Sequence, residues 1–208
     1  TSIEAILNKS SDFYLLADTN RILSIDTLNQ QRYSLQHVHV ISGSTKMKNN
    51  FFTIDVGENQ NVEEGMGLIG PNGIIGFVTD VGSQFALVKS VLCEDININA
   101  MIKKNGAHGF LKWNGRDPHL IQLNEITNDT DIKEGDTIVT RGSGSSFSRG
   151  MMIGIVDNVN SNDGAVYLSI DVRLLENMKQ VYNAFLVKDL FKSELDSTQN
   201  KIDLYHAK

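Results

Sequence analysis

The segment Ile132–Val156, IKEGDTIVTRGSGSSFSRGMMIGIV, decides the fold of this chain. It begins with a turn at Gly135 and Asp136, continues into a short β-rich strand, and then enters a glycine- and serine-rich loop over Arg141–Gly150. A second β-rich stretch follows, with Gly154 inside it. Glycine within a strand indicates a bulge or a tight bend, as small barrels use at their corners. The segment therefore predicts a hairpin with a long loop.

An earlier segment, Val62–Val78 (VEEGMGLIGPNGIIGFV), repeats this pattern with a shorter loop. Gly65 matches Gly135, and Gly76 matches Gly154. A repeated pattern of this kind predicts two related β units. The residues expected to set the fold at turns and bends are Gly65, Gly76, Gly135, Asp136 and Gly154.

Composition sets broad limits on the kind of protein. The chain has 208 residues, 40% of them hydrophobic, which allows one large domain or two small ones with a packed core. The formal net charge of −6 argues against a general nucleic-acid binder. The single cysteine, Cys93, rules out an internal disulfide framework, and its apolar surroundings predict a buried, inert thiol.

Short β-rich runs separated by glycine turns fill the chain from Gln36 to Lys188 and predict a mainly β protein of the sandwich or barrel type. We expect a first β unit over residues 36–125 and a second over 126–188. The strands near residues 38–56 could close either unit, so the first unit could be discontinuous. Residues 189–208 are polar and are expected to form a flexible tail.

The first 35 residues have a different character. They contain no glycine or proline and carry apolar residues at heptad spacing. This pattern predicts a long amphipathic helix of the coiled-coil type. Pairing of two such helices would give a homodimer, and packing of the helix on its own domain is the alternative. The predicted dimerisation residues are Ile6, Phe13, Leu16, Asn20, Leu23 and Leu28.

No run reaches the roughly 18–20 apolar residues that a membrane-spanning helix needs, and there is no signal peptide. The chain starts without methionine inside the predicted helix. We therefore expect that a membrane anchor could precede this segment.

The serine-rich loop does not have the pattern of a catalytic or phosphate-binding motif. A phosphate loop needs a following helix, and a nucleophile elbow needs Gly-x-Ser-x-Gly. His37 and His39 could bind a metal, but no further ligands complete a site, so a solvated strand face is favoured. We predict no catalytic, cofactor or metal site. The loop is predicted to contact a partner through Arg141, Ser145, Phe147 and Arg149.

At this point the ordered motifs resemble the MreC family of rod-shape-determining proteins, over most of residues 1–188. After the heptad helix, the resemblance rests on D-x-G, V-x-x-G-M-x-[VLI], P-x-G-x-x-G-x-V, I-K-x-x-G-x-x-G, and G-D-x-[IV]-V-T-x-G followed by I-G-x-V. In this chain these are Asp55–Gly57, Val62–Leu68, Pro71–Val78, Ile102–Gly109 and Gly135–Val156.

The resemblance implies a fold, a location and partners. It implies two small β-barrel subdomains behind a long N-terminal helix, similar to the barrels of chymotrypsin-type proteases but without a catalytic triad. Members are anchored in the inner membrane, lie in the periplasm and self-associate. They are linked to the MreB–MreD system and to a class B penicillin-binding protein. Many members have Ser where this chain has Arg141 and Pro where it has Ser148, so loop contacts made in relatives need not occur here.

We therefore predict a non-catalytic, membrane-anchored scaffold of bacterial cell-wall elongation. One alternative is a peptidoglycan-binding module that uses Trp113 as a sugar platform, although core packing of Trp113 is favoured. The other is a serine hydrolase that uses Ser143, Ser145 or Ser146 and a nearby histidine.

Overall fold

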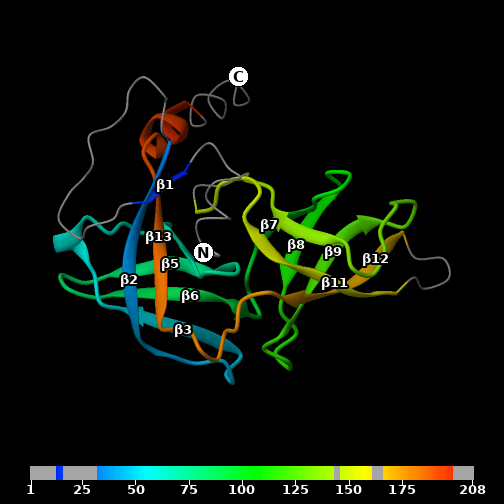
Figure 1. The fold of residues 1–208 in the computed structure, drawn as a ribbon, viewed down its shortest axis with the longest axis horizontal. Coiled ribbons are helices and arrows are strands. Elements are labelled where there is room, and N and C mark those ends of the chain that lie inside the picture. The colour runs from blue at the N-terminus through cyan, green and yellow to red at the C-terminus, as the bar shows by residue number, and fades with distance from the viewer. Residues whose placement is uncertain (1–12, 16–31, 143–145, 161–165, 199–208) are drawn as a thin grey trace, which may run out of the picture.

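The computed structural model describes residues 13–15, 32–142, 146–160 and 166–198. Two β-barrels lie side by side (Figure 1). The first has the strand order β2-β13-β4-β5-β6-β3, and pairing of β2 with β3 closes the ring. The second is closed with the order β10-β11-β12-β9-β8-β7. The predicted mainly β fold with two barrels is confirmed.

The first barrel takes strands from both ends of the described chain. Its strands are β2 (Tyr33–Gly43), β3 (Asn49–Ile54), β4 (Gly67–Ile69), β5 (Ile74–Val81), β6 (Ala86–Cys93) and β13 (Asn183–Asp189). A short 3-10 helix, η1 (Glu58–Gln60), connects β3 to β4.

The second barrel is continuous in sequence. Its strands are β7 (Ile98–Ile102), β8 (His108–Lys112), β9 (Leu120–Thr127), β10 (Thr137–Thr140), β11 (Met152–Asn160) and β12 (Tyr167–Leu174).

The expected division between residues 125 and 126 does not match the strand pairing. β7 and β8 lie in the predicted first unit but pair within the second barrel. β13 lies in the predicted second unit but pairs with β2 and β4 of the first barrel. The physical reason is closure, because the first barrel needs a strand between β2 and β4, and β13, the last strand of the described residues, occupies that place.

Two short stretches of the predicted N-terminal helix are described, and both are strands. β1 (Phe13–Leu15) pairs in parallel with Tyr33–Leu35 of β2. The prediction of a helix is therefore wrong at Phe13, which pairs with β2, and at these residues of β2, where backbone pairing with β13 overrides the heptad pattern. Outside the described residues lie Ile6, Leu16, Asn20, Leu23 and Leu28. The expected tail begins with the end of β13, and residues 192–198 form a helix.

The two matching turns have the same backbone geometry. Gly65 has a φ of 84° and Gly135 a φ of 86°, a conformation that residues with a side chain rarely adopt. The Gly65 N–H donates to the carbonyl of Val78 at 2.8 Å, and the Gly135 N–H donates to the carbonyl of Val156 at 2.9 Å. The repeat in the sequence thus corresponds to a repeat of the hydrogen-bond pattern.

The two strand glycines also share one environment. A Cβ on Gly76 would overlap the backbone carbonyl of Lys89, and a Cβ on Gly154 would overlap that of Arg173. In both hairpins the register shifts next to this glycine. Each glycine therefore lets a bulged strand bend closely over the next strand of its barrel.

A continuous hydrophobic cluster runs through both barrels. Alternation along the strands places one face of each inward, as in β3, where Phe52 and Ile54 are buried. Trp113 is 2% exposed, and its indole Nε1–H donates to the carbonyl of Asp117 at 3.0 Å. Cys93 is buried, and its Sγ–H donates to the carbonyl of Asn50.

We expect Gly154→Ala to lower the free energy of unfolding by about 2 kcal/mol or more, because the added Cβ overlaps a backbone carbonyl that cannot move aside. Gly82→Ala is the matched control, since its Cβ would lie 3.2 Å from the Phe85 carbonyl oxygen and the loop can adjust. Urea denaturation measures both. Equal losses in the two variants would contradict a bending role for Gly154.

Candidate partner-binding surfaces

The loop between β10 and β11 packs against the first barrel. Phe147 is 6% exposed. A Cβ on Gly67 of β4 would overlap the carbonyl oxygen of Ser146 and lie 2.9 Å from the Phe147 ring. Gly67 thus forms a notch that receives this loop. The ring of Phe147 is part of the core between the barrels, so a partner would not reach this ring in the structure as it stands, and a partner contact of this loop stays a prediction.

The base of the same loop is fixed by Thr140, which is 1% exposed. Its hydroxyl donates to the carbonyl of Ser148 at 2.5 Å and accepts from the N–H of Met151 at 3.0 Å. Gly142, with a φ of 77°, packs on the backbone of Arg149. Arg141 and Arg149 are exposed, so these two predicted contact residues remain accessible. Ser145 lies outside the described residues.

A second contact joins the barrels at Glu176, which is 6% exposed and lies on the connection from β12 to β13. Its Oε2 accepts from the backbone N–H of Asn72 at 2.9 Å. Its Oε1 accepts from the N–H of Asn177 at 3.1 Å. Because Asn72 lies in the turn between β4 and β5, the carboxylate holds a hairpin of the first barrel against the strand connection.

The outer surface of the first barrel carries apolar side chains, of which Phe51 and Phe77 are half-buried and Phe85 and Leu87 are exposed. Phe51 of β3 and Phe77 of β5 both pair with Lys89 of β6, and their inward neighbours are buried. Leu87, two residues from Lys89, is 36% exposed, and Phe85, in the turn just before β6, is 51% exposed. We call Phe51, Phe77, Phe85 and Leu87 the aromatic face.

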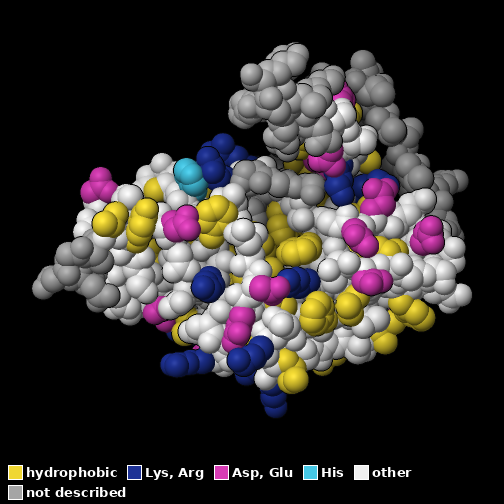
Figure 2. All heavy atoms as spheres, turned by 180° about the vertical axis from the view of Figure 1, so that it is seen from behind, with side chains coloured by type: hydrophobic (Ala, Val, Ile, Leu, Met, Phe, Trp, Pro, Cys, Tyr) yellow, Lys and Arg dark blue, Asp and Glu magenta, His cyan; other side chains and the backbone are white. Residues whose placement is uncertain are grey.

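The view from behind looks onto the outer side of β5 and β6, and hydrophobic side chains gather along the lower edge of the first barrel there (Figure 2). Phe77 pairs on its other side with Gly67, the notch residue. Phe51, Lys89, Phe77 and Gly67 thus lie side by side on four neighbouring strands. This row leads from the aromatic face to the contact between the barrels. Lys89 lies within this row, with its Nζ 2.6 Å from Asp95.

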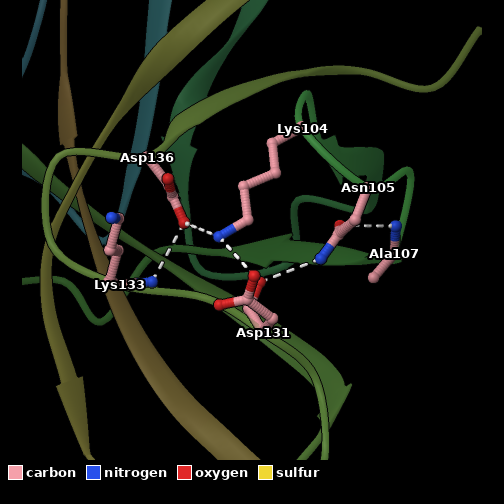
Figure 3. Close-up of polar contacts among 6 residues, drawn as sticks. All are labelled: Lys104, Asn105, Ala107, Asp131, Lys133 and Asp136. Atoms are coloured by element: carbon pink, nitrogen blue, oxygen red, sulfur yellow. Dashed lines mark hydrogen bonds and ion pairs between the residues drawn. The ribbon is translucent and has the colours of Figure 1, made fainter.

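A charged cluster links two connections of the second barrel (Figure 3). Lys104 Nζ lies 2.9 Å from Asp131 and 3.3 Å from Asp136. Asp136 Oδ2 accepts from the backbone N–H of Lys133 at 3.0 Å, and Asn105 donates to the carbonyl of Asp131. The cluster joins the β7–β8 turn to the β9–β10 connection, so its charges are engaged within the fold.

These contacts change the acidity of the groups involved. The hydrogen bond from the Lys133 backbone and the nearby Lys104 lower the pKa of Asp136. Hydrogen bonding to Asp131, then to Asp136, raises the pKa of Lys104. Both shifts favour the charged forms, as expected for groups that stabilise a turn.

Among the described residues, the histidine pair does not form a metal site and Trp113 does not form a sugar platform. His39 Nδ1 lies 2.8 Å from Asp55, and the His37 ring packs edge-on against His39 and Phe185. Within the described ranges, no group of three or more His, Cys, Asp or Glu residues could hold a metal ion. Trp113 is buried, so it cannot serve as a sugar platform, and that proposed basis for peptidoglycan binding is wrong.

The fold defines a double-barrel, mainly β protein whose two barrels share one core. The sequence model described as "Rod shape-determining protein MreC, barrel core" matches residues 40–188. The chain belongs to this family. It is a non-catalytic cell-shape family, so the chain is not an enzyme.

Relatives and solved structures agree with this assignment. The cell shape-determining protein MreC of Listeria monocytogenes is 28% identical over 166 residues, which cover 77% of this chain and 56% of the relative. The structure of MreC from Pseudomonas aeruginosa has a TM-score of 0.68 at 23% identity, covering 73% of this chain and 97% of that one.

A structure described as a complex between a penicillin-binding protein (PBP2) and MreC from Helicobacter pylori also has this fold. Its TM-score is 0.61 at 18% identity, covering 76% of this chain and 99% of that one. At this identity the likeness shows the fold alone. The chain spans about half the length of the curated relatives it matches. Among the helices of the described ranges, none has the length and apolar character to cross a bilayer.

We expect Phe147→Ala to lower the free energy of unfolding by about 3 kcal/mol, because it empties a buried space between the two barrels. Arg149→Ala, in the same loop but exposed, should change it by less than about 0.5 kcal/mol. Urea denaturation of both variants gives the comparison. If Phe147→Ala cost no more than Arg149→Ala, the loop would not hold the barrels together.

The lowered pKa of Asp136 predicts a pH-dependent contribution to stability. The charged form is favoured in the folded state, so the contribution is present above the ordinary value of 3.8 and is lost as pH falls through the lower folded value. We expect wild type to be more stable than Asp136→Asn at pH 7, with the difference shrinking as pH falls below 3.8. Glu134→Gln, an exposed change in the same turn, is the control. A difference that stays constant from pH 7 to pH 3 would rule out the carboxylate as its source.

Proposed function

We propose that this chain is the barrel region of a membrane-anchored, non-catalytic scaffold of bacterial cell-wall elongation that helps to determine cell shape. The observation that carries the proposal is family membership over residues 40–188. It is supported by the Helicobacter pylori structure, in which a family member is in complex with a penicillin-binding protein.

The aromatic face is the proposed docking site for a class B penicillin-binding protein. Protein interfaces concentrate their binding energy in aromatic and large apolar residues that become desolvated on binding. Leu87 is exposed on β6, a strand that is held by pairing on both sides, and Phe85 is exposed in the turn directly before this strand. A rigid surface of this kind loses little conformational freedom when a partner binds.

The loop that packs on Gly67 is a second contact in this proposal. Phe147 is buried, which leaves Arg141 and Arg149 as the accessible residues of the predicted contact set. Both arginines lie beside the contact between the barrels. A partner that covers the aromatic face and reaches these arginines would touch both barrels at once.

The remaining parts of the proposal concern the whole protein. We propose self-association through the N-terminal segment that contains Ile6, Leu16 and Leu23, and links to the MreB–MreD system. We also propose an anchor in the inner membrane that places the barrels in the periplasm. The heptad pattern and the family support these points.

The docking site can be tested with the purified chain and the class B penicillin-binding protein of the same bacterium. We expect the double variant Phe85→Ser, Leu87→Ser to weaken binding about tenfold or more in calorimetry, because it removes exposed apolar anchors. The matched control is Val166→Ser, Tyr167→Ser, which removes two exposed apolar residues of the second barrel.

Unchanged affinity of the Phe85, Leu87 variant, with folding verified by urea denaturation, would disprove the aromatic face as the docking site. Equal loss in the control would do the same, because it would show a general effect of surface hydrophobicity.

A further inference from the structure

A separate exposed surface lies at the turn between β2 and β3. Met47 in this turn is 62% exposed, Ile41 near the end of β2 is 55% exposed, and Tyr182 is 68% exposed. Tyr182 adjoins β2, because its carbonyl accepts from the N–H of Val40 at 2.9 Å. The aromatic face does not include these residues, and the fold does not use their side chains as core.

The backbone of this turn is held rigidly by Asn50, which is fully buried. Its Oδ1 accepts from the N–H of Met47 at 3.0 Å, and its Nδ2 donates to the carbonyl of Met47 at 2.7 Å and to that of Leu92 at 2.6 Å. Both backbone groups of Met47 are therefore fixed from below by one buried amide. The turn presents an apolar side chain to solvent without depending on that side chain for its shape.

Positive charge surrounds this apolar tip. Lys46 and Lys48 flank Met47 and are exposed, and Lys179 precedes Tyr182 on the same connection. The β8–β9 turn with Arg116 lies close by, since Glu94 donates its N–H to the carbonyl of Lys48 and its carboxylate lies beside Gly115. Lys and Arg side chains gather at the lower end of the molecule, around a hydrophobic side chain (Figure 2).

The local charge differs in sign from that of the whole chain. Four cations, Lys46, Lys48, Arg116 and Lys179, lie here with two carboxylates, Glu94 and Asp117, whereas the chain has a formal net charge of −6. None of the four cations has an ion-pair partner within 4 Å among the described residues. We call Ile41, Lys46, Met47, Lys48, Arg116 and Tyr182 the basic tip.

We propose that the basic tip docks on an anionic lipid bilayer surface. Lysines attract anionic headgroups while their stems lie along the interface, and a tyrosine is stable at that depth. Met47 would enter the boundary between headgroups and acyl chains. A convex hairpin tip fits a deformable surface better than a flat rigid one. The negative charge elsewhere on the chain is repelled by the same lipids, so the attraction also orients the molecule.

Co-sedimentation with lipid vesicles tests this proposal and is independent of any penicillin-binding protein. Wild type should bind vesicles with about one third phosphatidylglycerol and not vesicles of phosphatidylcholine alone, and binding should fall as salt is raised. The variant Lys46→Glu, Lys48→Glu should bind at least about tenfold more weakly. Met47→Ser should weaken binding to a smaller extent, because it removes only the apolar contact.

The control is Lys103→Glu, Lys133→Glu, which reverses two exposed lysines of the second barrel and produces the same net charge. It should keep binding close to that of wild type. Equal binding to both kinds of vesicle, an equal loss in this control, or no effect of the Lys46, Lys48 reversal would each overturn the proposal. An unchanged affinity of Met47→Ser would overturn insertion of the tip.

Discussion

The pairing of β13 with β2 on one side and β4 on the other is the constraint on which the rest of the structure depends. It turns an open sheet into a closed barrel and so removes two exposed strand edges. It also brings together chain segments that are far apart in sequence. At the end of β13, the buried carboxylate of Asp189 accepts from Arg32 Nη2 at 2.8 Å and from the N–H of Phe191 at 3.0 Å. The connection into β13 carries Glu176, so the same strand also fixes how the two barrels meet.

The double β unit could be predicted because backbone constraints leave a mark in the sequence. A left-handed turn admits little except glycine, so Gly65 and Gly135 stand out, and close strand approach restricts Gly76 and Gly154 in the same way. The serine-rich loop lacks the spacing of a phosphate loop or a nucleophile elbow, which predicted that the chain is not an enzyme. Membership of a non-catalytic family confirms this prediction. The pairing partner of β13 could not be predicted, because alternating apolar residues show that a strand has a buried face without showing which edge it joins.

The candidate surfaces were less predictable. Phe147 lies in a polar loop, and only the notch at Gly67, in a distant part of the sequence, makes its ring part of the core. The aromatic face was missed because Phe51, Phe77 and Leu87 are residue types that are common in any strand. Only the register of the strand pairing shows that they lie on the same outer side of the first barrel. The heptad signal near Tyr33–Leu35 was overridden by ladder pairing, which sequence periodicity does not describe.

The difference between the barrels has a consequence for the order in which they form. β7 to β12 follow one another in the chain, so the second barrel can complete all its hydrogen bonds from one uninterrupted segment. The first barrel must wait for β13, which follows all of β7 to β12 in the chain, and until then β2 and β4 each have one unpaired edge. Long-range pairing of this kind is slow and leaves partly folded chains open to association. During synthesis, which proceeds from the N-terminus, the edges of β2 and β4 would thus stay exposed until β13 has been made.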